Sequence, residues 1–78
     1  MENEIKQIIS DVSKVAMTEV HEDAELGNDL AIDSLDLLDV VTELEKKYQI
    51  DIPAEDMTDF ITVKDIITAV QSMVKTDE

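Results

Sequence analysis

Apolar residues recur every three or four positions in two terminal stretches of the chain, and this spacing predicts two amphipathic helices. The first stretch contains Ile5, Ile8, Ile9, Val12 and Val15. The last contains Val63, Ile66, Ile67, Val70 and Met73. Thr62 and Asp65, three residues apart at the start of the last stretch, predict a capping box with a shorter acidic side chain than usual.

A third helix is predicted over residues 34–48, with three kinds of surface. Its apolar arc, predicted to face the core, consists of Leu37, Val41, Leu44 and Tyr48. An acidic side consists of Asp36, Asp39 and Glu43. Between the two lie Leu35, Leu38 and Thr42, which form a smaller strip beside Ser34.

The connections between these helices are unequal in length. Residues 17–33 form a long connection that contains the only glycine, Gly27, and connections of this length are often functional. We expect four of its apolar residues to anchor it: Val20, Leu26, Leu30 and Ile32. Residues 50–53 alternate and end at Pro53, which predicts an extended link. Residues 54–57 are predicted to form a short helical turn, with Phe60 and Ile61 packing inward after it.

The fold class that follows is all-α: a small four-helix bundle of three main helices and one short helix, with a long loop between the first two. The 78 residues suit one domain, residues 1–78. Aromatic residues make up only 3% of the chain, which favours packing between helices over a sandwich of strands. The absence of cysteine excludes a disulfide scaffold.

The net charge of −14 restricts the possible partners. It repels nucleic acid and anionic membranes, favours a monomer, and steers the chain towards basic patches on other proteins. We expect salt or magnesium to stabilise the fold, which thermal melts with and without magnesium would test. The N-terminus has no basic start followed by an apolar run, so the expected location is the cytoplasm, with no membrane insertion.

Enzymatic chemistry is poorly supported by the residues available. With one histidine, His21, and one glycine, a serine–histidine–acid site has few possible arrangements, and His21 stands in an acidic stretch expected to face water. Residues 29–36 lack the alternating oxygen ligands of a calcium loop, so no metal site is predicted.

Ser34 is the residue that remains as a candidate for chemistry. It stands where the long connection meets the middle helix, as the cap or in the first turn. Serine and aspartate at such positions often only satisfy free backbone N–H groups. The same position exposes a hydroxyl and favours an attached phosphate through the helix dipole. Leu35 and Leu38 beside Asp36 and Asp39 are compatible with either a docking face or a solvated charged face.

The segment Asp33-Ser34-Leu35, followed by residues 36–45, resembles the acyl carrier protein family. The resemblance extends to residues 5–9, 20–32, 50–53 and 60–63, and so covers nearly the whole chain. It implies a four-helix bundle that does not catalyse a reaction but carries acyl groups as thioesters on 4'-phosphopantetheine attached to Ser34. It also implies that growing chains are sheltered between the helices.

The resemblance implies partner enzymes as well. A phosphopantetheinyl transferase (holo-carrier synthase) would modify Ser34, and acyl transferases, ketosynthases or ligases with basic patches would dock on the carrier. The positions that match family docking residues, or lie in the adjoining strip, are Asp33, Leu35, Asp36, Leu38, Asp39, Thr42, Glu43 and Glu45.

Three positions depart from the family pattern. The family usually has glycine at Ala31, often methionine at Thr42, and an acidic residue at Lys46. Alanine at position 31 is expected to stiffen the turn if its backbone angles permit. These departures put partner choice in question, so the expected pathway is fatty-acid or related lipid synthesis, with a specialised polyketide, aminoacyl or other acyl pathway as the alternative. A remote alternative is an unmodified acidic interaction module, which would not need Ser34.

Overall fold

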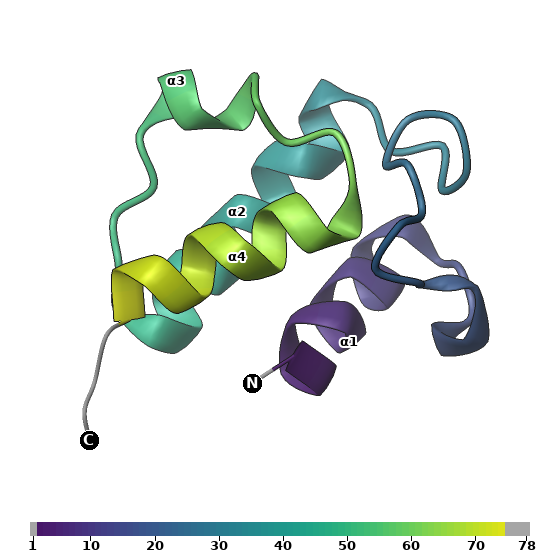
Figure 1. The fold of residues 1–78 in the computed structure, drawn as a ribbon, viewed down its shortest axis with the longest axis horizontal. Helices are drawn as coiled ribbons and strands as arrows, with labels where there is room; N and C mark the ends of the chain where they lie inside the picture. Colours follow the sequence, from purple (N-terminus) through teal and green to yellow (C-terminus); the bar gives the residue numbers. More distant parts are fainter. Residues whose placement is uncertain (1, 75–78) are drawn as a thin grey trace.

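Helices account for the regular structure of residues 2–74, the part of the chain that the computed structural model describes (Figure 1). The elements are α1 (Glu2–Ser13), a 3₁₀ turn η1 (Met17–Glu19), α2 (Ser34–Tyr48), α3 (Ala54–Met57) and α4 (Val63–Val74). The all-α prediction of three main helices, one short helix and a long first connection is therefore confirmed. The pattern did not predict η1, which lies inside that connection.

One core joins the main helices to the long connection. Figure 1 shows α4 passing in front of α2 with α1 beside them, and all three contribute to the same cluster of buried side chains. The connection supplies Val20, Leu26, Leu30 and Ile32, all buried, as predicted. Burial of these four apolar side chains explains how a long connection with little regular structure stays attached to the bundle.

The buried face of α2 contains the predicted arc, whose four residues all pack in or against the core, but is wider than that arc. Val41 and Leu44 are buried as predicted, but Leu37 and Tyr48 are only partly buried, and Val40 is fully buried although it was not included. The arc was predicted from the helical period alone and is too narrow. Other elements of the fold cover more of the helix surface, so its buried stripe widens towards Val40.

Hydrogen bonds outside the helical ladders fix how α1 and α4 are held. The Tyr48 hydroxyl, at the end of α2, donates to Oε1 of Glu4 in α1 at 2.8 Å. At the start of α4, the backbone N–H of Thr62 donates to Oδ2 of Asp65 at 3.0 Å, and the N–H of Asp65 donates to Oγ1 of Thr62 at 3.3 Å. The predicted capping box is confirmed by this reciprocal pair.

The link before α3 is tied to α2 by a side chain. Residues 50–53 are non-helical, as predicted, and α3 occupies the predicted residues 54–57. The N–H of the buried Ile52 donates to Oε2 of Glu45 at 2.8 Å. No helix among residues 2–74 combines the length and hydropathy needed to cross a membrane.

Candidate functional site

Ser34 is the first residue of α2, and its neighbour Asp33 is the cap. The Asp33 carboxylate accepts the N–H of Asp36 at 2.9 Å, and its carbonyl accepts the N–H of Leu37 at 2.9 Å. Of the two positions left open for Ser34, the structure places it in the first turn rather than at the cap. Because Asp33 performs the capping, the exposed hydroxyl of Ser34 is not needed to start the helix.

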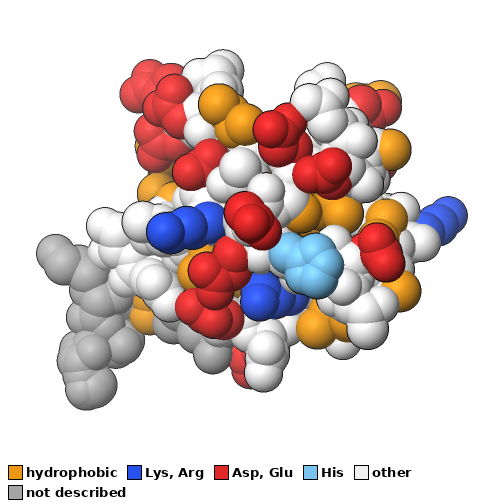
Figure 2. Space-filling model, turned by 45° about the vertical axis from the view of Figure 1, so that its right-hand side comes forward, with side chains coloured by type: hydrophobic (Ala, Val, Ile, Leu, Met, Phe, Trp, Pro, Cys, Tyr) orange, Lys and Arg blue, Asp and Glu red, His pale blue; other side chains and the backbone are white. Residues whose placement is uncertain are grey.

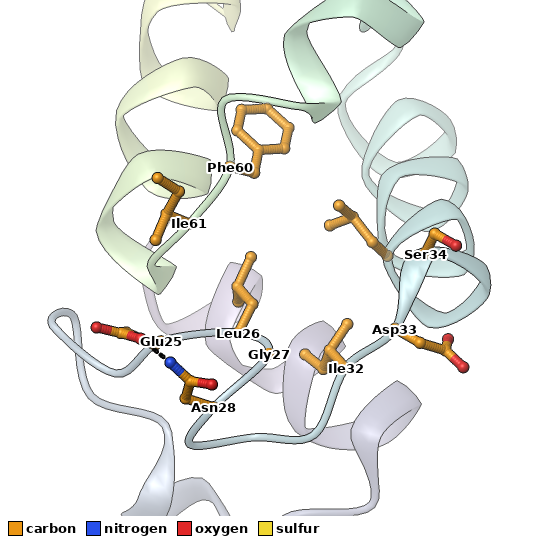
Figure 3. A pocket seen from close by; sticks show the side chains of 10 residues that line it. Glu25, Leu26, Gly27, Asn28, Ile32, Asp33, Ser34, Phe60 and Ile61 are labelled. Carbon is orange, nitrogen blue, oxygen red and sulfur yellow. Dashed lines mark hydrogen bonds between the residues drawn. The ribbon is translucent and has the colours of Figure 1, made fainter.

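A groove of about 380 Å³ lies beside Ser34, between the long connection, the start of α2 and the segment after α3 (Figure 3). Its apolar lining consists of Leu26, Ile32, Leu37, Phe60 and Ile61, and its remaining lining of Glu25, Gly27, Asn28, Asp33 and Ser34. Figure 3 shows Leu26 and Phe60 on opposite sides of the hollow, with Ser34 across from Ile61. An exposed hydroxyl therefore stands at the edge of an apolar groove.

Two segments distant in sequence form one wall of this groove. The N–H of Leu26 donates to the carbonyl of Ile61 at 2.9 Å, and the N–H of Val63 donates to the carbonyl of Ala24 at 3.1 Å. An isolated antiparallel bridge pairs Glu25 with Thr62. These bonds join the long connection to the segment between α3 and α4, so the groove has a fixed side.

The prediction that both Phe60 and Ile61 pack inward is wrong for Ile61. Phe60 is partly buried against the core, whereas Ile61 is 61% exposed. In extended backbone, successive side chains point to opposite sides, so two neighbours cannot both face the core. Ile61 consequently adds an exposed apolar side chain to the rim of the groove.

Asp65 holds the backbone at this rim. Its Oδ2 accepts the N–H groups of both Thr62 and Ile61, each at 3.0 Å. The hydrogen bond from the Thr62 backbone, followed by that from Ile61, lowers the pKa of the Asp65 carboxyl, since both bonds favour its charged form. The charged side chain therefore fixes the Ile61 wall as well as the start of α4.

Ala31, three residues before Ser34, was expected to stiffen the turn if its backbone angles permit, but its backbone angles do not. Its φ is 55°, in the left-handed region, whereas the only glycine of the chain, Gly27, has no positive φ. Alanine at such an angle is strained rather than usefully stiff. The exposed Ala31 lies between Leu30 and Ile32, both buried.

The structure brings most of the predicted docking residues to the exposed part of α2. Leu35 is 71% exposed and Leu38 50% exposed, and both are accessible to a partner. Asp33, Asp39 and Glu43 are exposed, while Asp36 and Thr42 are partly exposed. Glu45 is also partly exposed, and its carboxylate accepts the N–H of Ile52, which lies outside α2.

The groove is also lined by Glu25, Gly27 and Asn28, which were not predicted as site residues from the sequence. The turn formers at residues 27–29 were the available signal. The side-chain amide of Asn28 donates to Glu25, and the N–H of Glu25 donates to Oδ2 of Asp29 at 2.8 Å. These local bonds shape the loop at the groove's edge.

His21 lies apart from this site. It is exposed and lines another cavity, together with Glu19, Asp23, Ala24 and Asp29. Figure 2 shows the histidine at the surface with acidic side chains around it. The expectation that His21 faces water is confirmed.

Comparison with known proteins defines the class of the chain. Residues 3–70 match the family described as "Phosphopantetheine attachment site", so this is a phosphopantetheine-carrying protein. The chain is 36% identical over 72 residues to the acyl carrier protein of Chlamydia felis, covering 92% of each. It is 34% identical over 70 residues to that of Rhodococcus erythropolis, covering 90% of this chain and 77% of the relative.

A third relative has a more specialised name. The meromycolate extension acyl carrier protein of Mycobacterium leprae is 33% identical over 69 residues, which are 88% of this chain and 60% of that protein. The chain belongs to the acyl carrier protein family, and as a member it is a non-catalytic carrier.

Proposed function

We propose that Ser34 is the residue that carries 4'-phosphopantetheine, and that residues 1–78 act as one carrier domain. The observation that carries this proposal is an exposed hydroxyl in the first turn of the longest helix, at the edge of an apolar groove. A phosphate on that hydroxyl would lie near the positive end of the α2 dipole. The groove offers apolar side chains along which the arm can lie.

The arm, when attached, supplies a thiol that holds acyl groups as thioesters. The chain's own residues present and orient the hydroxyl: Asp33 caps α2 and so fixes the first turn in which Ser34 lies. The chain's one histidine lines a different cavity, so activation of Ser34 is assigned to a phosphopantetheinyl transferase. Acyl transferases, ketosynthases or ligases then act on the carried group in the cytoplasm.

We propose the partner-docking surface on α2 around Leu35 and Leu38, with Asp33, Asp36, Asp39, Thr42 and Glu43 beside them. Exposed leucines next to carboxylates suit basic patches with apolar centres on these enzymes. Glu45 was included in this set by resemblance. Its bond to Ile52 supports a structural role in addition.

Fatty-acid or related lipid synthesis is the pathway we propose. A specialised acyl pathway is the second candidate, because Thr42 and Lys46 depart from the family pattern on the docking helix, and Lys46 is exposed. A charge of changed sign at the rim of an interface alters which partners match. Loading of the arm by ligases of different acyl specificity would separate the two pathways.

Intact-protein mass spectrometry tests the assignment of Ser34. The protein is incubated with coenzyme A, magnesium and a broad-specificity phosphopantetheinyl transferase, alongside Ser34→Ala and the matched control Ser72→Ala. Ser72 is an exposed serine in α4. We expect one added phosphopantetheine on wild type and on Ser72→Ala, and none on Ser34→Ala. Modification of Ser34→Ala, or no addition to folded wild type that lacks the arm, would contradict the proposal.

A further inference from the structure

A second groove, of about 360 Å³, lies between α1 and α2, away from the cavity that Ser34 lines. From α1 it is lined by Ile8, Asp11 and Val12, and from α2 by Asp39, Thr42 and Glu43. The α2 residues are part of the proposed docking surface. The α1 residues are not, and no sequence motif points to them.

The groove combines an apolar floor with an acidic rim. Ile8 and Val12, four residues apart on α1, are both partly buried against the core. Asp11, Asp39 and Glu43 line the same groove, and all three residues are exposed. Apolar surface this close to several negative charges is suited to a cation with an apolar stem.

The hydrogen bonds of Thr42 and Asp11 leave the groove apolar and acidic. The Thr42 hydroxyl already donates to the carbonyl of Leu38 at 2.8 Å, so it is not a free donor. Asp11 accepts a bond from Nε2 of Gln7 at 2.9 Å, and a carboxylate has room for further donors. No lysine of residues 2–74 is among those that line the groove, so none of these lysines neutralises it from within.

We infer that this groove is a second part of the docking surface and binds an arginine side chain from a helix or loop of a partner enzyme. The inference rests on the proposed carrier function for the identity of the partner. Arginine fits because its stem packs on Ile8 and Val12 while its planar head donates to carboxylates. A second copy of this chain has no arginine and the same charge of −14, and nucleic acid or anionic lipid is repelled.

A model peptide tests the chemistry without requiring the enzyme. The probe is a synthetic helical peptide with arginine and leucine on one face, titrated into the ¹⁵N-labelled full chain. A peptide with glutamate in place of arginine is the control ligand. We expect amide shifts at residues 8–12 of α1 together with residues 39–43 of α2. Shifts confined to α2, or spread evenly over the acidic surface, would overturn the inference.

Matched variants separate the groove from general charge attraction. Asp11→Asn removes one rim charge, and Asp51→Asn removes the same charge from an exposed residue that lines neither groove. We expect Asp11→Asn to weaken peptide binding about threefold or more, in line with one exposed ion pair, and Asp51→Asn to have a much smaller effect. Equal weakening by the two variants would contradict a specific site.

The outcome is independent of the Ser34 assignment. The peptide needs no arm, so Ser34→Ala is expected to bind it as wild type does. If the arm is not attached but the peptide maps to the groove, the carrier proposal fails and the groove remains a protein interface. If the arm is attached and the shifts miss α1, only the groove proposal fails.

Discussion

Residues other than glycine occupy the left-handed backbone region at three described positions: Lys14, Ala31 and Gln49, with φ of 63°, 55° and 54°. Ala31 is the one nearest to Ser34. Its Cβ makes this conformation costly, by about 1–2 kcal/mol in the folded state. The chain therefore keeps a strained residue next to its proposed attachment site.

Ala31→Gly is expected to stabilise the fold by roughly 0.5–1 kcal/mol, because relief of the left-handed strain exceeds the added freedom of the unfolded chain. Gly27→Ala is the reverse control: a Cβ there meets no atom within 4 Å and φ is not positive. We expect that change to be neutral or to stabilise by a few tenths of a kcal/mol. Urea denaturation of both variants checks this, and destabilisation by Ala31→Gly would show that the alanine is not strained.

At the scale of elements, the sequence determined where helices form better than which side chains they expose. Period and caps predicted the main helices, the capping box at Thr62 and Asp65, and the short helix after Pro53. The burial of Val40 and the exposure of Ile61 depend on neighbouring segments. A helical period gives the direction of a side chain on its own helix, but not how many other elements cover that direction.

In the candidate site, too, some features follow from local sequence and others depend on contacts between distant segments. Ser34 and the exposed strip with Leu35 were identified from local sequence. The groove wall requires a bond between Leu26 and Ile61, which are far apart in sequence, and this pairing leaves no local signal. The α1–α2 groove likewise arises only when the two helices pack.

Glu45 joins α2 to the link before α3 through its bond to Ile52, which predicts that it stabilises the fold. Glu45→Ala leaves the N–H of buried Ile52 without its acceptor, so we expect a loss of about 1–2 kcal/mol in the free energy of unfolding. Glu43→Ala, at an exposed position of the same helix, is expected to change it by less than about 0.5 kcal/mol. Chemical denaturation compares the pair. Equal stability of the two variants would assign Glu45 to docking alone.

At the scale of the whole molecule, negative charge and apolar contact surface occur together. The face shown in Figure 2 carries many acidic side chains and few lysines, with apolar side chains visible between them. Such a surface attracts basic partners over a distance that shrinks as ionic strength rises. The exposed leucines of α2 then provide contact area that charge alone cannot.

The bond between Tyr48 and Glu4 makes the chain its own optical reporter. Tyr48 is the only tyrosine and there is no tryptophan, so the near-ultraviolet absorbance at wavelengths longer than those of phenylalanine comes from Tyr48 alone. The hydroxyl of this side chain bonds from α2 to Glu4 in α1. Burial, and then the bond to Glu4, raises the pKa of Tyr48 to about 12. This contribution to stability is complete below the ordinary tyrosine pKa of about 10, and it is lost as the pH rises from there through the folded-state value of about 12.

A spectrophotometric titration of the folded protein should therefore show tyrosinate forming well above the pH at which free tyrosine ionises. In Glu4→Ala, which removes both the acceptor and the charge, we expect the transition to move to lower pH but to stay above that of free tyrosine, because burial is the larger cause. An unchanged transition would mean that the bond does not persist in solution. If the transition does shift, the absorbance of Tyr48 reports, without any added dye, whether α1 remains in contact with α2 when a partner binds.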